Sequence, residues 1–179
     1  MVIPINRANN ADYEAIKGKK IASGQHRNVF EVKGHRNVVL KEEIFSDLKI
    51  NETEYQVYQI TSLNHPCAAK TIAKIYSISA DGMYLIMEKL DTENINDGEA
   101  YNVMVEITDR KKSNFGKDSK GMIKCLDYST LKITDDTADQ GGIICITGNV
   151  VSESFPTKKC NEEYRDILSK LDSIYNEKI

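Results

Sequence analysis

The sequence predicts an α+β fold, with five short antiparallel strands and one helix in the first half of the chain and a smaller second half. Runs of β-branched and apolar residues at 16–41 and 72–87 are interrupted by tight-turn signals, which is typical of antiparallel strands. Between these runs, residues 51–63 carry apolar side chains at helical spacing. A chain of 179 residues suits one domain or two small lobes.

The first three strands are expected to form a meander. Residues 16–22 alternate weakly between apolar and polar side chains, whereas 28–32 and 37–40 are β-branched and apolar. Lys33-Gly34-His35 supplies a tight turn between the second and third strands, and Lys41 ends the third strand. After the helix, strands at 72–78 and 83–87 enclose a turn.

The second half has weaker signals. Residues 91–98 are polar and rich in Asn and Asp, which favours a loop, and 99–107 are expected to form one short helix. The acidic segment 134–140 is expected to be exposed, 143–151 to form a strand or hairpin, and 161–175 to form an amphipathic helix. We divide the chain into an N-terminal leader or extension, a first lobe and a truncated second lobe: residues 1–15, 16–90 and 91–179.

Three side chains of the second half suit phosphoryl transfer. Asn114 follows Asp109 by five residues, and Asp127 follows Asn114 by thirteen. Phosphoryl transfer needs one carboxylate that orients the attacking hydroxyl and accepts its proton. It also needs an amide oxygen and a second carboxylate that hold the Mg²⁺ ions bridging the ATP phosphates. Asp109 is the candidate catalytic residue, and Asn114 and Asp127 are the candidate metal ligands.

Features upstream stand in the order found in the protein-kinase superfamily, which the chain resembles from 16 to 175. They are a glycine turn at Gly24, the strand Val38-Val39-Leu40-Lys41, similar to the kinase pattern Val-Ala-Ile-Lys, and a glutamate on the next helix. Asp109-Arg110-Lys111-Lys112-Ser113-Asn114 looks more like the Asp-Arg-His-x-x-Asn loop of phosphoinositide-kinase-like enzymes than the His-Arg-Asp loop of eukaryotic protein kinases. The small second half is similar to the minimal kinases that bacteria inject into host cells, such as the HopBF and OspG families.

The resemblance implies a kinase-like first lobe of five antiparallel strands with one helix, and it implies roles for single residues. Lys41 would clamp the ATP phosphates as a second catalytic residue, held by Glu54 or, as the alternative, by Glu52. Met87 would stand as gatekeeper at the back of the adenine pocket, and backbone groups beyond it would bind the adenine edge. The residues implied in ATP binding are Ile21, Gly24, Val29, Lys41, Glu54, Met87, Glu88 and Leu90.

The chain also departs from the kinase pattern. Ala22 and Arg27 stand where two of the three loop glycines are usual, and Ile107-Thr108 replaces the His-Arg before the catalytic Asp. Tyr128-Ser129 replaces the Phe-Gly after the metal-binding Asp, and no Ala-Pro-Glu motif follows. Arg110 is expected to face the substrate or the ATP phosphates. Because Thr108 cannot pair with a loop phosphate, we expect activity without phosphorylation of this protein.

The bulk composition excludes several classes of protein. Hydrophobic residues make up 40 % and charged residues 28 %, which is an ordinary globular balance. The 24 basic and 27 acidic residues are interleaved, so we expect no nucleic-acid partner. No apolar run approaches membrane-spanning length, so no membrane span is expected. The four cysteines lack metal-site spacing and are expected to be free thiols in a reducing compartment.

The leading hypothesis is a monomeric Ser/Thr protein kinase that depends on ATP and Mg²⁺. The resemblance to minimal effector kinases implies a cytoplasmic protein, or one that bacteria secrete into the host cytosol, with a host protein as substrate. A HopBF-type enzyme would act on a chaperone of the Hsp90 class. Two alternatives stay open: a lipid or small-molecule kinase, and a non-catalytic kinase-like module that binds a partner protein.

Overall fold

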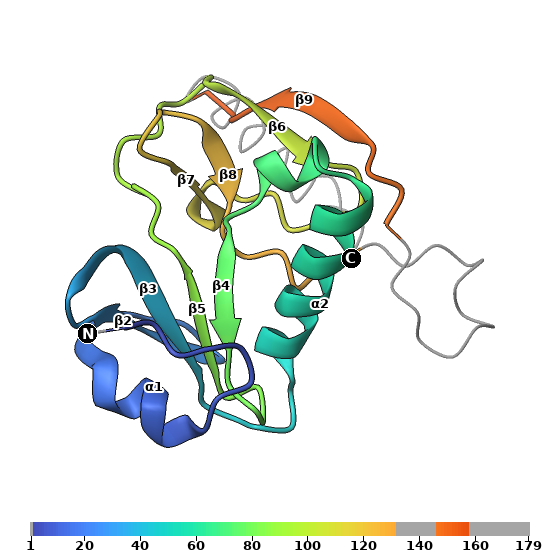
Figure 1. The fold of residues 1–179 in the computed structure, drawn as a ribbon. Helices are drawn as coiled ribbons and strands as arrows, with labels where there is room; N and C mark the ends of the chain where they lie inside the picture. The colour runs from blue at the N-terminus through green and yellow to red at the C-terminus, as the bar shows by residue number, and fades with distance from the viewer. Residues whose placement is uncertain (1, 132–145, 158–179) are drawn as a thin grey trace, which may run out of the picture.

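The protein has an α+β fold built around a five-stranded antiparallel sheet, as expected (Figure 1). The computed structural model describes residues 2–131 and 146–157. The strand order in the sheet is β1-β2-β3-β5-β4, and neighbouring strands pair antiparallel. The strands are β1 (Lys17–Ser23), β2 (Arg27–Val32), β3 (His35–Glu43), β4 (Ile75–Ile78) and β5 (Tyr84–Glu88).

The two faces of this sheet bury different residues because side chains alternate along each strand. On β3, Val38 and Leu40 pack into a cluster with Tyr13 of helix α1 (Asn10–Ile16). Val39 joins the larger core on the other face, together with Val57 of helix α2 (Ile50–Asn64). Lys41 shares the face of Val39 and is therefore directed toward α2.

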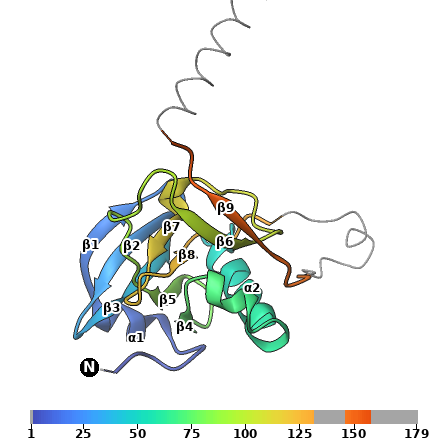
Figure 2. The ribbon, with the colours of Figure 1, turned by 90° about the horizontal axis from the view of Figure 1, so that it is seen from above.

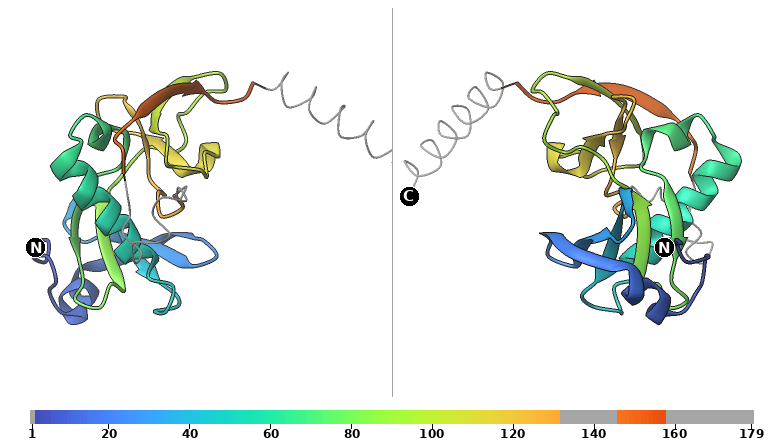
Figure 3. Two further views of the ribbon diagram at one scale, coloured as in Figure 1. Left: turned by 90° about the vertical axis from the view of Figure 1, so that its right-hand side faces the viewer. Right: turned by 60° about the vertical axis from the view of Figure 1, so that its left-hand side comes forward.

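Helix α1 begins within residues expected to form an N-terminal leader or extension, and it is packed against the sheet. The Tyr13 ring is fully buried and stacks on Tyr84 of β5, with ring centroids 5.9 Å apart. Ile16 is also buried in this cluster. Two views show α1 at the end of the molecule away from strands β6 (Ala100–Met104) and β9 (Val150–Ser154) (Figures 1 and 3).

In the described residues, the second half contains two small two-stranded sheets and the short 3₁₀ helix η2, while a second 3₁₀ helix, η1, ends the helical part of the first half. Strand β6 pairs antiparallel with β9, which lies beside it in Figure 2, and β7 forms a hairpin with β8. The 3₁₀ helix η1 follows α2, and η2 precedes β7. The elements are η1 (Ala68–Thr71), β6 (Ala100–Met104), η2 (Lys112–Asn114), β7 (Phe115–Lys117), β8 (Ile123–Cys125) and β9 (Val150–Ser154).

The short helix predicted at 99–107 is wrong, because most of that segment is strand β6. Along β6 the buried side chains of Tyr101 and Val103 alternate with exposed ones, which is the two-residue period of a strand. The hydrogen-bonding partner is β9, with Val103 opposite Val151. Strand β9 overlaps the end of the strand or hairpin predicted at 143–151, of which 143–145 lie outside the described residues.

One core joins the two halves. Tyr101, Phe115 and Phe155 form an aromatic group, with centroids 4.3 Å apart for the stacked pair Tyr101 and Phe155. These rings belong to the same buried cluster as Val57 and Met87 of the first half. Burial of large apolar side chains, at about 1.5–3 kcal/mol each, holds the β7–β8 hairpin against the larger sheet. The acidic segment at 134–140 and the helix predicted at 161–175 lie outside the described residues.

Candidate functional site

A cleft of about 1040 Å³ lies between the five-stranded sheet and the β7–β8 hairpin. Its volume is of the size that small-molecule and cofactor sites occupy. Five of the residues expected to contact ATP line it: Ile21, Val29, Lys41, Met87 and Leu90. The rest of the lining comes mainly from the segment that follows β5 and from the hairpin region, including Lys89, Asp91, Asn94, Ser113, Lys117 and Leu126.

Three of the residues expected to contact ATP do not line this cleft. Gly24 lies in the turn between β1 and β2, where a Cβ would make only an ordinary contact, 3.6 Å from the Arg27 carbonyl oxygen. Space at this turn therefore does not require glycine. The Glu88 carboxylate pairs with Lys124 at 2.9 Å, and Glu54 lies behind Lys41.

Gly116 of β7 lets the β7–β8 hairpin pack closely against the segment that follows β5. A Cβ at this position would lie 2.5 Å from the Leu90 Cβ, closer than real Cβ contacts, so only glycine fits. The backbone of β7 therefore passes directly beside the segment after β5, and Asp91 and Lys117 exchange two backbone hydrogen bonds of 2.8 Å there. This close approach brings the residues that follow η2 and β8 next to the sheet.

Lys41 and Glu54 form a buried ion pair beside the cleft. Lys41 Nζ lies 3.0 Å from Glu54 Oε2 and 3.3 Å from Oε1, and the Glu54 side chain has no exposed surface. Lys41 Nζ also donates to the carbonyl oxygen of Leu126. Glu52, the alternative partner, instead forms a bidentate pair with Arg7, with both distances 2.7 Å. The partner of Lys41 is therefore Glu54.

Arg27, the first residue of β2, completes this group and was not among the candidates from the sequence. Its Nη1 donates to Glu54 Oε2 at 2.7 Å, and its Nη2 donates to Glu54 Oε1 at 3.1 Å and to Asp127 Oδ1 at 2.8 Å. The sequence does contain a signal, an arginine where the loop pattern has its third glycine. We call Arg27, Lys41, Glu54 and Asp127 the ion cluster.

The protonation states of the ion cluster follow from its two buried cations. Burial opposes the charged form of Glu54, but the charges and hydrogen bonds of Arg27 and Lys41 outweigh it and lower the pKa of Glu54 to about 2. Burial, followed by the charge of Arg27, lowers the pKa of Lys41, while Glu54 and Asp127 oppose that change. Burial also disfavours the charged form of Arg27, yet Glu54 and Asp127 raise the pKa of its guanidinium.

Asp109, Asn114 and Asp127 meet near the ion cluster because of the β7–β8 pairing. Phe115 stands opposite Cys125, and the Leu126 amide donates to the Asn114 carbonyl oxygen at 2.8 Å, which places the residues before β7 next to those after β8. Asn114 is buried, and its Nδ2 donates to the Asp109 carbonyl oxygen at 3.0 Å. The amide oxygen of Asn114 is thus the atom left for a metal ion.

Asp109 is partly exposed and has a cationic neighbour. Its Oδ2 lies 2.8 Å from Lys111 Nζ. The hydrogen bond from Lys111 is the main reason that the pKa of Asp109 is lowered, with Asn114 contributing and the charge of Asp127 opposing. Asp109 and Asp127 are thus close enough for their charges to repel each other. Asp109 is an ionised carboxylate at neutral pH.

Tyr128 anchors the segment after Asp127. Its side chain is fully buried, its hydroxyl donates to the Ala73 carbonyl oxygen at 2.9 Å, and its backbone N–H donates to Glu54 Oε1 at 3.2 Å. Glu54 therefore accepts hydrogen bonds from Arg27, Lys41 and Tyr128. This one carboxylate connects α2, β2, β3 and the segment that carries Asp127.

Arg110 does not line the cleft, so the expectation that it faces the ATP phosphates is wrong. Its guanidinium pairs with Glu153 of β9 and donates to the carbonyl oxygens of Val105 and Ile107, the latter at 2.7 Å. These bonds hold the segment between β6 and η2 in shape. Arg110 therefore supports the backbone that carries Asp109.

The residues present fit a hard divalent cation. Asn114 offers an amide oxygen, and Asp127 offers Oδ2, because Oδ1 accepts from Arg27 and, at 3.3 Å, from the Ser129 hydroxyl. Carboxylate and amide oxygens are ligands that Mg²⁺ accepts, usually with several waters and substrate phosphates completing its shell. Among the described residues, no group of three or more His, Cys, Asp or Glu side chains could hold a metal ion.

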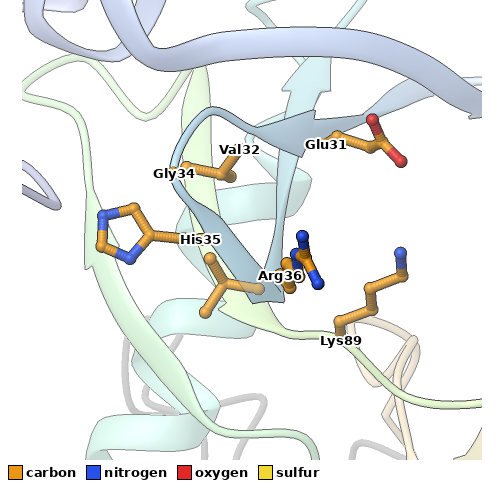
Figure 4. A pocket seen from close by; sticks show the side chains of 7 residues that line it. Glu31, Val32, Gly34, His35, Arg36 and Lys89 are labelled. Carbon is orange, nitrogen blue, oxygen red and sulfur yellow. The ribbon is translucent and has the colours of Figure 1, made fainter. Parts of the chain in front are cut away.

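A second hollow of about 570 Å³ lies at the β2–β3 hairpin (Figure 4). Figure 4 shows Arg36 and Lys89 on the same side as Glu31, with the His35 ring on the other side of the hairpin. Arg36 and Lys89 also line the larger cleft, so the two hollows share a basic rim. None of Asp109, Asn114 and Asp127 lines this second hollow or the larger cleft, although their neighbours Ser113 and Leu126 line the larger one.

No protein-family model matches the sequence, and no curated protein matches it significantly. In the part of the chain that the structure describes, no helix is long and apolar enough to cross a membrane.

Proposed function

We propose that this protein is an ATP- and Mg²⁺-dependent phosphotransferase with a reduced kinase-like fold, acting on Ser or Thr of a protein. The observation that carries the proposal is the connection of Lys41, which lines the cleft, to Glu54 and through Arg27 to Asp127. Asn114, which bonds to the Asp109 backbone, lies next to them through the β7–β8 pairing. Their order along the chain and their residue types are those that phosphoryl transfer uses. The five-stranded antiparallel sheet with α2 is compatible with a kinase-like first lobe.

In this proposal the cleft holds the adenine between Val29 and Met87 on the sheet side and Leu90 on the opposite side. Lys41, kept in place by Glu54, contacts the phosphates at the inner end of the cleft. Asn114 and Asp127 hold Mg²⁺, which supplies charge neutralisation at the phosphates. Because such catalysis is mostly positioning and electrostatic stabilisation, a small second half suffices.

Asp109 orients the acceptor hydroxyl and takes its proton. Its lowered pKa keeps it ionised at neutral pH, which a proton acceptor requires. The hydrogen bond from Asn114 to the Asp109 carbonyl oxygen fixes the backbone of this residue relative to the metal ligand. The Arg110 bonds to carbonyl oxygens provide a second restraint on the same segment.

The acceptor is proposed from the resemblance to minimal effector kinases, which supports a host protein, and for a HopBF-type enzyme a chaperone of the Hsp90 class. The test is incubation of the protein with γ-labelled ATP and Mg²⁺ in a eukaryotic lysate. A discrete labelled band is expected with the native protein and not with Lys41→Met. The absence of label, together with absence of nucleotide binding, would contradict the proposal.

A second candidate function is a non-catalytic module that binds a partner protein. The contact between Arg27 and Asp127 favours it, because it engages a carboxylate that a kinase needs for metal. The two functions differ in nucleotide binding: the module would show no Mg²⁺-dependent affinity for ATP, whereas the phosphotransferase would. Binding of ATP in the presence of Mg²⁺ therefore decides between them.

A further inference from the structure

Arg27, the first residue of β2, makes several side-chain contacts at the candidate site. Its side chain is about 10 % exposed, and its two terminal nitrogens donate to Glu54, to Asp127 and, at 3.5 Å, to Asn51. Each terminal nitrogen of a guanidinium carries two hydrogens, so these contacts use the donors of both. The Arg27 guanidinium thus bonds mainly to protein carboxylates, and few of its N–H donors remain for a phosphate.

The contact with Arg27 gives the two oxygens of the Asp127 carboxylate different surroundings. Oδ1 accepts from Arg27 at 2.8 Å and from the Ser129 hydroxyl at 3.3 Å. A carboxylate that binds two metal ions commonly gives one oxygen to each, and an oxygen that already accepts two hydrogen bonds has no lone pair left to bridge. With Oδ1 held by a guanidinium, Asp127 has Oδ2 for one divalent ion, which it would share with the amide oxygen of Asn114.

The charges in the cluster agree with a single metal ion. The Arg27 guanidinium, whose charge is permanent, lies 2.8 Å from Asp127 Oδ1. A second divalent ion at Asp127 would be placed beside a buried guanidinium that cannot lose its proton. Repulsion between two cations at such short range in a partly buried site disfavours that arrangement.

We propose that Arg27 is a positioning residue of the nucleotide site: it holds Asp127 Oδ1 next to Glu54, so that Asp127 presents Oδ2 to one divalent ion instead of two. This inference rests on the proposed phosphotransferase function. It assigns to Arg27 the fixed alignment of Asp127 with Glu54 of α2. The guanidinium fork suits this task because it binds two carboxylates in set directions.

The test counts metal ions with Mn²⁺ as the probe. Mn²⁺ and the non-hydrolysable analogue AMP-PNP are added to the full chain, and electron paramagnetic resonance measures bound Mn²⁺ per bound nucleotide. The native protein is expected to bind one Mn²⁺. Arg27→Met frees Oδ1 and is expected to bind two, while its kcat for transfer falls by about 10- to 100-fold, as is usual when the partner of a metal ligand is removed.

Two further variants separate positioning from packing. Arg27→Lys keeps a positive charge beside Asp127 and is expected to bind one Mn²⁺, with a smaller loss of kcat than Arg27→Met. Arg7→Met removes a different bidentate arginine–glutamate pair from α2, at Glu52, and is expected to change neither the Mn²⁺ count nor kcat. Where Arg27→Met does not fold, Arg27→Gln replaces it, because its amide still donates to Glu54.

The outcomes distinguish this inference from the function on which it rests. Two Mn²⁺ ions in the native protein would overturn the inference and leave the phosphotransferase intact. So would a folded Arg27→Met or Arg27→Gln with one Mn²⁺ and unchanged kcat. Failure of the native protein to bind Mn²⁺ with AMP-PNP would overturn the proposed function and this inference together.

Discussion

Replacement of Glu54 by glutamine tests the ion cluster most severely. The change keeps the shape of the side chain but removes the charge that two buried cations share. Removing one partner of a buried ion pair costs about 3–5 kcal/mol, because the remaining charge is left uncompensated. We therefore expect Glu54→Gln to lower the free energy of unfolding at pH 7 by about 3 kcal/mol.

The lowered pKa of Glu54 expresses the same interactions as a dependence on pH. Its fall from the ordinary 4.5 to about 2 corresponds to about 3 kcal/mol, at about 1.36 kcal/mol per pH unit. Because the folded pKa is the lower one, this stabilisation is complete above about pH 4.5 and is lost as the pH falls toward 2. The difference between the native protein and Glu54→Gln should thus be constant from pH 7 to about pH 5 and shrink below that.

The assay is urea unfolding at a series of pH values, with Glu52→Gln as the matched control. Glu52 is two residues away on the same helix and pairs with Arg7 at the surface, where an ion pair contributes about 0–1 kcal/mol. Equal losses in the two variants, or a difference for Glu54→Gln that does not change down to pH 3, would refute the buried cluster.

Two further predictions concern catalysis. Asp109→Ala should keep ATP binding but lower the transfer rate by several orders of magnitude, because its carboxylate acts on the acceptor hydroxyl; a parallel loss of binding and turnover would move Asp109 to the metal site or to structure. The protein should be active as synthesised, because Thr108 stands where phosphate-regulated kinases carry an arginine and instead bonds to the Thr130 carbonyl oxygen. Phosphatase-treated protein, checked by intact mass, should show no lag in label transfer; a lag removed by pre-incubation with ATP would contradict this.

The first half of the fold could be predicted because its signals are local. The alternation around Val38 and Leu40 gives strand β3, and it also determines that Lys41 faces α2. On α2, Val57 follows Glu54 by three positions, so the buried face of the helix includes the carboxylate. Glu52 lies outside that face. The choice between the two glutamates follows from helical spacing.

The second half could not be predicted in the same way because its partners are distant in the sequence. Strand β6 is stabilised by β9, which begins 46 residues after β6 ends, since Val150 follows Met104 by that number. When a short segment pairs with only one distant strand, its own residues do not show whether it forms a helix or a strand. The role of Arg27 could not be predicted for the same reason, because its side chain contacts Glu54 and Asp127, which are distant in the sequence.

Nucleotide binding by the native protein and by Asp127→Ala tests the central claim most directly. Thermal unfolding is measured with and without ATP and Mg²⁺, and ligand at about 100 times its Kd should stabilise the native protein by about 2.7 kcal/mol, or about 5–10 °C in Tm. Asp127→Ala should remain folded, because Arg27 still forms its two hydrogen bonds to Glu54. The variant should lose the Mg²⁺-dependent increase in Tm. An equal increase in the variant, or none in the native protein, would contradict a metal–nucleotide site at Asp127.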